Sequence, residues 1–400
     1  MLDTFAHRRH NSLVGFDKPR VAFVLWSGDI GGAETQIHLL AREFRTTDID
    51  ASIIFVTRGG PLTKRLARDN IPWYTLGFRR GSAVTIHPRR LLKALNTYGS
   101  AGVVLPDVGF LVAALRLGGY KSPIIAIDHG SLLQMPYLPT IKRRRLIWTR
   151  SSAEKFSYEH VVVSNAMRDE VLRYNPRAHC TVIYNGVDLP TSISPPELTL
   201  DDSLIVGCVG RLTGEKGLQY VIRALAGQDA ILRIAGDGRH RARLESLARE
   251  VGVSSRVEFL GWIHDVQSFW RECHVAIMPS IGSESFGLAA AEAMAAARPV
   301  IVSQQVGLVE IVGSSGVIVP PGDTDTITRV LERFSDAPDD LRSIAIRSRQ
   351  RAELLFDVRQ TSRAYMRLLR LDLYRDHDPE RSTDEQAKHT TVRQSILGNT

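Results

Sequence analysis

Short apolar runs alternate with amphipathic segments through the first half of the chain. The run Arg20–Trp26 is almost entirely apolar, as expected of a buried parallel strand, and it ends in the glycine-containing stretch Ser27–Glu34. Apolar residues then recur at spacings of three and four, which predicts a helix. Further strands are predicted at Ala51–Val56, Gly102–Leu105, Ile124–Ile127 and His160–Val163. This alternation of strand and helix is typical of an α/β sheet.

The same alternation restarts after a proline-rich linker, Leu189–Pro196. Strands are then predicted at Leu204–Val209, Ala230–Ile234, Val257–Leu260, Val275–Met278 and Pro299–Val302, with helices at Leu218–Leu225, Arg241–Val251 and Leu288–Ala297. The sequence therefore predicts an α/β fold of two doubly wound, Rossmann-like domains, over residues 20–189 and 204–351, joined by a linker at 190–203.

The two ends of the chain have a different character. Residues 1–19 are polar and are expected to form a flexible leader that lacks the apolar segment of a signal peptide. An arginine-rich helix with apolar residues at helical spacing is expected over 352–375. The polar tail 376–400 is expected to be disordered.

Composition narrows the class of protein. Of 400 residues, 44% are hydrophobic and 24% are charged, which is ordinary for a soluble globular protein. The 51 basic and 43 acidic residues give a net charge of +8, which suits an anionic partner: a nucleotide diphosphate, an acidic lipid headgroup or nucleic acid. A generic basic surface explains the excess equally well. Nucleic acid is disfavoured because aromatic residues are only 7% and no known module is recognised.

Cysteine usage and hydropathy point to a cytoplasmic setting. The three cysteines are far apart, with no Cys-x-x-Cys pair, so neither a zinc site nor a disulfide framework is predicted. No apolar run approaches the about 20 residues of a membrane-spanning helix. Any membrane contact is therefore expected to be peripheral, at the inner face.

A glycine-rich turn after the predicted strand Leu204–Val209 carries two cations. Arg211 and Lys216 stand among Gly210, Gly214 and Gly217, and ligands of open α/β sheets bind at the carboxyl ends of strands. Glycine lets the backbone approach an anion closely, arginine offers a fork of donors, and lysine offers a mobile charge. The pattern predicts a phosphate site. The competing interpretation is a solvated turn with incidental charges.

A second cluster, Gly282–Gly287, follows the predicted strand Val275–Met278 and precedes an alanine-rich helix. A helix N-terminus beside glycine is a suitable anion site. Glu284 lies in the loop, and Glu292 lies eight residues later, about 12 Å further along the helix axis at the usual rise. A carboxylate there can accept two hydrogen bonds from a vicinal diol. Taken alone, Glu292 is better explained as the partner of a nearby arginine.

These segments together resemble the nucleotide-sugar-binding glycosyltransferases of the GT-B fold, specifically family GT4. The resemblance covers most of the chain. It rests on Gly31-Gly32-Ala33-Glu34, Asp128-His129, Val163–Ala166, Ile183–Asp188, Gly210–Gly217, Gly236-Asp237-Gly238, and the pair Glu284 and Glu292. The stretch Ser303–Glu310 departs from the family pattern, which has paired glycines there.

The resemblance implies a retaining transferase that needs no metal. Arg211 and Lys216 would neutralise the leaving diphosphate, Glu292 would hold the ribose and Glu284 would contact sugar hydroxyls. His129 would hydrogen-bond the sugar, although a lone histidine after a strand is more often structural. The last helix would cross back to the first domain. Further donor contacts would come from Gly31, Gly32, Gly236, Phe286, Gly287 and Leu288.

The resemblance leaves the substrates open. A UDP-sugar is the first expectation for the donor and a GDP-sugar the second. The acceptor is expected to be a glycan or a lipid-linked precursor of cell-surface polysaccharide or glycolipid, bound by loops such as 107–110 and 130–139. The basic run Lys142–Arg145 on a predicted amphipathic helix would suit an anionic membrane, but a solvated basic face is slightly favoured.

Three other functions compete with the transferase. A nucleotide-sugar epimerase could use the same scaffold, and a non-catalytic nucleotide-sugar-binding protein could keep the same residues. A dinucleotide dehydrogenase is disfavoured because Gly207–Gly210 lacks the full Gly-x-Gly-x-x-Gly fingerprint. Product analysis separates these functions, since it would yield a new glycoside, an epimerised sugar nucleotide or no product.

Overall fold

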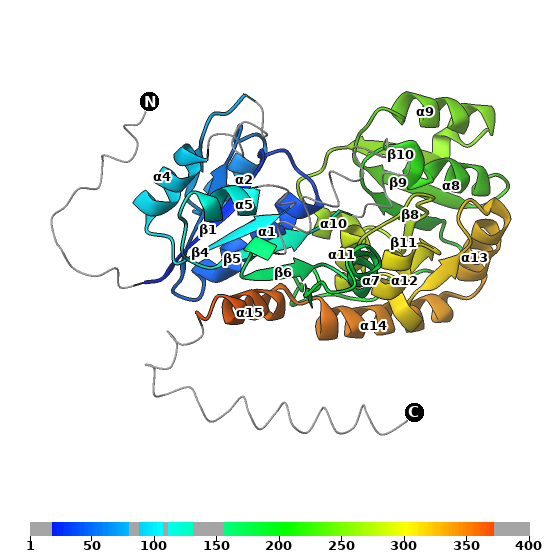
Figure 1. Ribbon diagram of the computed structural model, residues 1–400. Helices are drawn as coiled ribbons and strands as arrows, with labels where there is room; N and C mark the ends of the chain where they lie inside the picture. Colours follow the sequence, from blue (N-terminus) through cyan, green and yellow to red (C-terminus); the bar gives the residue numbers. More distant parts are fainter. Residues whose placement is uncertain (1–17, 80–87, 107–110, 131–154, 372–400) are drawn as a thin grey trace, which may run out of the picture.

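A computed structural model of the chain describes residues 18–79, 88–106, 111–130 and 155–371. These residues form two α/β domains side by side (Figure 1), each with a fully parallel sheet. The leader, the tail, the basic run Lys142–Arg145 and most of the loops expected to bind the acceptor lie outside the described residues.

The N-terminal domain contains a seven-stranded sheet in the order β3-β2-β1-β4-β5-β6-β7. Its central strands are continuous apolar runs because helices cover both faces. Helices α1, α2 and α7 cover one face, and α4 and α5 cover the other. The elements are β1 (Arg20–Leu25), α1 (Gly32–Arg45), β2 (Asp50–Phe55), α2 (Leu62–Arg68), β3 (Trp73–Thr75), α4 (Arg89–Tyr98), β4 (Gly102–Pro106), α5 (Leu111–Leu117), β5 (Ile124–Asp128), β6 (Glu159–Val162), α7 (Asn165–Tyr174) and β7 (Thr181–Val182).

The C-terminal domain contains a six-stranded sheet in the order β10-β9-β8-β11-β12-β13. The strand order reverses between β8 and β11, the position where ligands bind in open α/β sheets. The elements are β8 (Leu204–Val209), α8 (Leu218–Ala224), β9 (Ala230–Ala235), α9 (Arg241–Glu250), β10 (Val257–Gly261), α10 (Val266–Arg271), β11 (Val275–Met278), α11 (Leu288–Ala295), β12 (Val300–Ser303), α12 (Val306–Val312), β13 (Val317–Val319), α13 (Thr324–Asp336), α14 (Pro338–Leu355) and α15 (Val358–Leu368).

The chain crosses between the domains twice, and the two crossings lie side by side. The Val187 N–H donates to the Phe356 carbonyl at 2.7 Å, and the Val358 N–H donates to the Val187 carbonyl at 3.1 Å. One apolar cluster runs from Phe23 in the first sheet through Phe356 to Met278 in the second. The domains therefore share a core on the side of the two crossings.

The helix expected over 352–375 requires a correction, because the structure has two helices there, α14 and α15. The break falls at Phe356 and Asp357, where the chain pairs with Val187. The Asp357 carboxylate accepts from the Arg359 N–H at 2.9 Å and so caps α15. Helix α14 packs under the C-terminal domain and α15 under the N-terminal domain (Figure 1). The predicted crossing of a C-terminal helix back to the first domain is confirmed, since α15 packs against α1.

Candidate functional site

Two helix N-termini, one from each domain, meet where the carboxyl edges of the sheets face each other. Helix α1 follows β1 and begins after Gly31, and α11 follows β11 and begins after Gly287; neither N-cap residue makes a side-chain capping bond. A Cβ atom added to Gly32 would lie 4.0 Å from Leu288 Cδ2. The partial positive charges of both helix starts therefore point into one region, which favours an anion there.

The predicted cation and carboxylate, Lys216 and Glu284, are brought together by their loops. Lys216 Nζ forms a short ion pair with Glu284 Oε1, and Ser280 Oγ donates to the same oxygen at 2.8 Å. The Glu215 carbonyl accepts from the Ile281 N–H at 2.8 Å, which ties the first loop to the second. The pairing of these two charged residues is thus built into the backbone.

Gly217 explains why these loops can approach so closely. Its φ of +73° lies in the left-handed region, and a Cβ atom there would lie 1.9 Å from the Pro279 carbonyl oxygen. Only glycine fits without displacing the backbone after β11. The glycine pattern in this turn therefore serves first to place Lys216 against the loop that carries Glu284.

Arg211 has a different environment from Lys216. Its side chain is exposed, and it forms no hydrogen bond or ion pair with any residue in the described part of the chain. Gly236, which was expected to contact the donor, has its N–H in a hydrogen bond to the Gly261 carbonyl at 2.7 Å, so this N–H is not free for a ligand. A Cβ atom on Gly236 would lie 1.9 Å from the Gly210 oxygen, so this glycine supports the turn that carries Arg211.

Glu292 lies on α11, one turn beyond Leu288, and is partly exposed. The Glu292 carboxylate makes no hydrogen bond or ion pair with any of the described residues, so the expected arginine partner is not in contact. Burial raises the pKa of Glu292 to about 7, the Arg65 charge from the N-terminal domain lowers this pKa, and the Asp188 charge raises it. A carboxylate without a protein partner, facing the opposite domain, can accept hydrogen bonds from a ligand.

Phe286 and Gly287 shape the loop from behind. Phe286 is buried, with its ring centroid 5.7 Å from that of Phe356 and 6.1 Å from that of Tyr184. Gly287 has a φ of +90°, and a Cβ atom there would lie 2.4 Å from Leu308 Cδ2. His129 follows β5 directly, at the same edge of the first sheet as Gly31.

The sequence did not indicate the hydrogen bonds by which the N-terminal domain contacts α12 and the loop that carries Glu284. Four residues join α7 and its neighbourhood to α12 and the Glu284 loop: Ser164, Asn165, Tyr184 and Glu310. The first three belong to segments noted as family-like, but no pattern in the sequence indicated their partners. The Arg65 and Asp188 charges near Glu292 were missed for the same reason.

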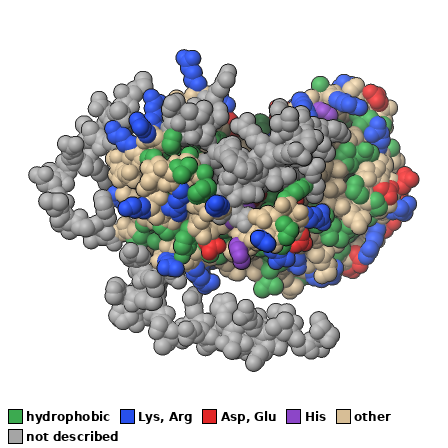
Figure 2. Space-filling view, viewed as in Figure 1, with side chains coloured by type: hydrophobic (Ala, Val, Ile, Leu, Met, Phe, Trp, Pro, Cys, Tyr) green, Lys and Arg blue, Asp and Glu red, His purple; other side chains and the backbone are tan. Residues whose placement is uncertain are grey.

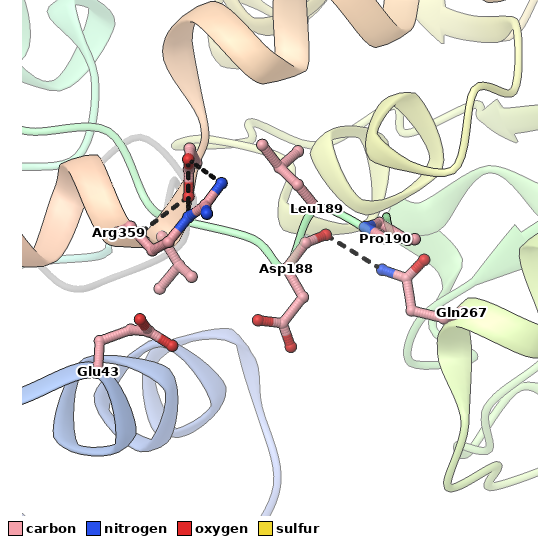
Figure 3. A pocket seen from close by; sticks show the side chains of 8 residues that line it. Glu43, Asp188, Leu189, Pro190, Gln267 and Arg359 are labelled. Atoms are coloured by element: carbon pink, nitrogen blue, oxygen red, sulfur yellow. Dashed lines mark hydrogen bonds and ion pairs between the residues drawn. The ribbon is translucent and has the colours of Figure 1, made fainter. Parts of the chain in front are cut away.

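A cavity of about 390 Å³ lies beside the two chain crossings (Figure 3). Its charged side chains are already paired: Arg42 with Asp188 and Glu43, and Arg359 with Asp357. None of the predicted site residues lines this cavity. It is lined by Glu43, Asp188, Leu189, Pro190, Gln267, Asp357, Val358 and Arg359.

Metal and membrane features are absent from the parts of the chain that the structure describes. No cluster of His, Cys, Asp and Glu there has the arrangement of a metal site. The carboxylates of Asp48 and Asp323, both in Asp-x-Asp sequences, are used elsewhere, since one pairs with Lys18 and the other caps α13. No helix among these residues is long and apolar enough to cross a membrane.

Two facing Rossmann-like domains with helix N-termini at the shared edge define a GT-B architecture. The family model described as Glycosyltransferase Family 4 matches residues 30–190, and the one described as Glycosyl transferases group 1 matches residues 191–351. The MMP α-(1→4)-mannosyltransferase of Mycolicibacterium hassiacum is 32% identical over 310 residues, 71% of this chain and 73% of that protein. The chain belongs to this family of group 1 glycosyltransferases, and the predicted family is confirmed.

Other similarities are more partial or concern the fold. An uncharacterized glycosyltransferase of Methanocaldococcus jannaschii is 35% identical over 239 residues, 54% of this chain and only 56% of that protein's length. The structure of Anabaena HepE in complex with UDP and glucose has a TM-score of 0.74 at 22% identity, covering 88% of this chain and 99% of that one. Sucrose-phosphate synthase from Thermosynechococcus elongatus has a TM-score of 0.72 at 18% identity, covering 89% and 99%. The predicted GT-B fold is confirmed.

Proposed function

We propose that the protein is a retaining glycosyltransferase that moves a sugar from a UDP- or GDP-linked donor to a glycan or lipid-linked acceptor. The observation that carries the proposal is that the start of α1 lies opposite the start of α11, next to the loop in which Glu284 pairs with Lys216. We infer that Arg211 and Glu292 belong to the same site. Cations and amide dipoles suit a diphosphate, and carboxylates suit the hydroxyls of a sugar and a ribose.

The diphosphate would bind between the exposed Arg211 guanidinium and the start of α11. Lys216 would turn from Glu284 toward the phosphate, which leaves Glu284 to accept hydrogen bonds from the donor sugar. As the bond between the anomeric carbon and the diphosphate oxygen breaks, negative charge grows on the leaving group, and Arg211 and Lys216 stabilise it. The acceptor hydroxyl oxygen forms the new bond to the anomeric carbon, and its proton passes to the departing diphosphate oxygen.

The remaining predicted contacts complete the donor site. Glu292 would hold the ribose, and His129 would hydrogen-bond the sugar from the opposite domain. Gly31 and Gly32 would let the start of α1 approach the phosphates. A side chain at Gly32 would occupy the space in front of Leu288, and one at Gly31 would meet the Glu34 carboxylate. These charges suffice without a metal ion in the proposed mechanism.

A lipid-linked acceptor at the inner membrane face, in cell-surface polysaccharide or glycolipid synthesis, suits the charge distribution. In the view of Figure 2, Lys and Arg side chains lie over both domains, whereas Asp and Glu are seen mainly on the C-terminal domain. A basic surface on the domain that faces the acceptor favours anionic headgroups.

A thermal-shift screen against UDP, GDP and their common sugar conjugates, with and without magnesium, tests the donor site. A ligand at a hundred times its dissociation constant adds about 2.7 kcal/mol to the free energy of unfolding. We expect a shift with one nucleotide family that magnesium does not change. If no nucleotide gives a shift, the proposal is contradicted. If a nucleotide gives a shift but product analysis then finds an epimerised sugar nucleotide instead of a glycoside, the protein is an epimerase.

A further inference from the structure

The Glu310 carboxylate on α12 of the C-terminal domain binds the start of α7 in the N-terminal domain. Glu310 Oε1 accepts from the Asn165 N–H at 2.7 Å, from Asn165 Nδ2 at 2.8 Å and from the Tyr184 hydroxyl at 2.8 Å. Glu310 Oε2 accepts from the Ala166 N–H at 2.8 Å. One side chain thus makes four hydrogen bonds across the domain boundary.

This contact completes the cap of α7. The first amides of a helix have no partner within it, and their partial positive charge favours a carboxylate. Ser164, the N-cap residue, accepts from the Met167 N–H at 3.1 Å, whereas the Asn165 and Ala166 amides are satisfied only from the other domain. Separating the domains at this point would leave two amides and a partly buried carboxylate to find new partners, which is costly.

The same contact region supports the loop that carries Glu284. Ser164 Oγ donates to the Ser285 carbonyl at 2.6 Å, and both residues are buried. Tyr184, which donates to Glu310, also packs its ring near Phe286. The loop between Glu284 and Phe286 is therefore held from behind by residues of the N-terminal domain.

Helix α12 is fixed against this loop from its own domain. A Cβ atom on Gly307 would lie 2.2 Å from the Glu284 carbonyl oxygen, so the first turn of α12 touches the loop backbone. At the other end of α12, Arg351 donates to the carbonyls of Glu310 and Ile311 at 2.8 and 2.7 Å. A movement of Glu310 would therefore be transmitted to the backbone of Glu284.

We propose that Glu310 is a positioning residue that couples the engagement of the two domains to the geometry of the Glu284 loop. When the first amides of α7 are hydrogen-bonded to the Glu310 carboxylate, the loop holds Glu284 opposite Lys216. When α7 moves away from Glu310, the loop loses its support from Ser164 and Tyr184. The coupling to sugar transfer rests on the proposed function, but the coupling to loop structure does not.

Glu310→Gln tests this coupling in the full chain. The amide keeps the size of the side chain but turns a donor toward the α7 amides. The matched control is Glu332→Gln, an exposed residue of α13 that accepts from Gln228. Hydrogen exchange should become at least tenfold faster in Glu310→Gln both at Asn165 and Ala166 and in the loop 283–287. Turnover should fall about tenfold, while UDP or GDP affinity stays within threefold.

Faster exchange at α7 with an unchanged loop would overturn the proposal, because Glu310 would then be only a helix cap. Unchanged turnover in Glu310→Gln would overturn it as well. Should this variant fail to fold, Tyr184→Phe removes a single donor to Glu310 and should give smaller changes in the same direction. Should the wild-type protein bind no nucleotide, the proposed function fails, and the exchange comparison still decides whether Glu310 holds the loop.

Discussion

Lys216 and Glu284 lie 68 positions apart in the sequence and form an ion pair in the C-terminal domain, between the loops that follow β8 and β11. Each charge compensates the other, and the side chains are only 29% and 16% exposed. A diphosphate entering this region would compete with Glu284 for the ammonium group. The pair therefore keeps the lysine in place at the site while leaving it able to change partners.

Lys216→Ala should lower turnover about a hundredfold or more, because removing one preorganised charge donor costs roughly 3–4 kcal/mol of transition-state stabilisation. Release of free nucleoside diphosphate from the donor measures the rate. Lys216→Arg is the matched control, since it retains the charge and should keep part of the activity. Turnover near that of the wild type in a folded Lys216→Ala protein would remove this residue from the mechanism.

Glu292 should make the stability depend on pH. Because its pKa is raised to about 7, from an ordinary value near 4.5, the folded state retains a proton that the unfolded state has lost between these pH values. The free energy of unfolding should therefore fall as the pH rises from about 4.5 to 7, by at most about 3 kcal/mol since water reaches part of the residue.

Urea unfolding of wild type and Glu292→Gln at pH 5 and pH 8 measures this effect. The glutamine variant cannot ionise, so its stability relative to wild type should be greater at pH 8 than at pH 5. Glu332→Gln on the exposed face of α13 should show no such difference. Donor affinity should change in the opposite sense, because ribose hydroxyls need the ionised carboxylate, and it should increase as the pH rises through 7.

The core strands and the loops that follow them could be predicted from the sequence. Strands such as Leu204–Val209 are buried on both faces and appear as continuous apolar runs, and the glycines after them mark backbone that must approach other backbone. The placement of Lys216 and Glu284 in loops after two strands agrees with the rule that ligand-binding loops lie at the carboxyl ends of parallel strands, whereas their ion pair was not predicted.

Contacts made between distant segments could not be predicted in this way. The break between α14 and α15 falls inside a continuous helical pattern, and it is imposed by the pairing of Val187 with Asp357, which only the folded chain reveals. Likewise, Glu310 binds Asn165 across 145 positions. Local periodicity carries no information about such a partner.

Alanine substitutions should show that Gly307 is needed for stability, whereas Gly32 is needed for donor binding. A Cβ atom on Gly32 meets only Leu288, at 4.0 Å, so this variant should unfold within about 0.5 kcal/mol of wild type. A Cβ atom on Gly307 would lie 2.2 Å from backbone, so that variant should lose about 1–3 kcal/mol. Chemical denaturation measures both values.

Activity should respond differently in these two variants. In Gly32→Ala the added methyl group lies where α1 would approach the donor phosphates, so donor affinity should fall although the fold is intact. Full donor affinity in Gly32→Ala would show that the start of α1 does not contact the donor. Full stability in Gly307→Ala would show that α12 can move away from the Glu284 loop without cost.

Arg298 should contribute to the stability of the fold but not to the chemistry of the site. Its buried guanidinium donates to the carbonyls of Ala296 and Cys273, both at 3.0 Å, and to that of Ser194 at 2.5 Å, which fastens the linker to the C-terminal domain. Lysine cannot satisfy three diverging carbonyls, and buried acceptors left without donors cost about 1–3 kcal/mol each.

Arg298→Lys should therefore lower the free energy of unfolding by about 2–4 kcal/mol, measured by urea denaturation. Arg342→Lys on the solvent side of α14 is the control and should change it by less than about 0.5 kcal/mol. At a temperature where both variants are folded, nucleotide affinity should equal that of the wild type. Arg298 precedes β12, whereas Lys216 and Glu284 follow strands β8 and β11, and the Arg298 donors bind carbonyls of Ala296, Cys273 and Ser194. A selective loss of affinity in folded Arg298→Lys would instead mean that the linker helps to set the position of the site loops.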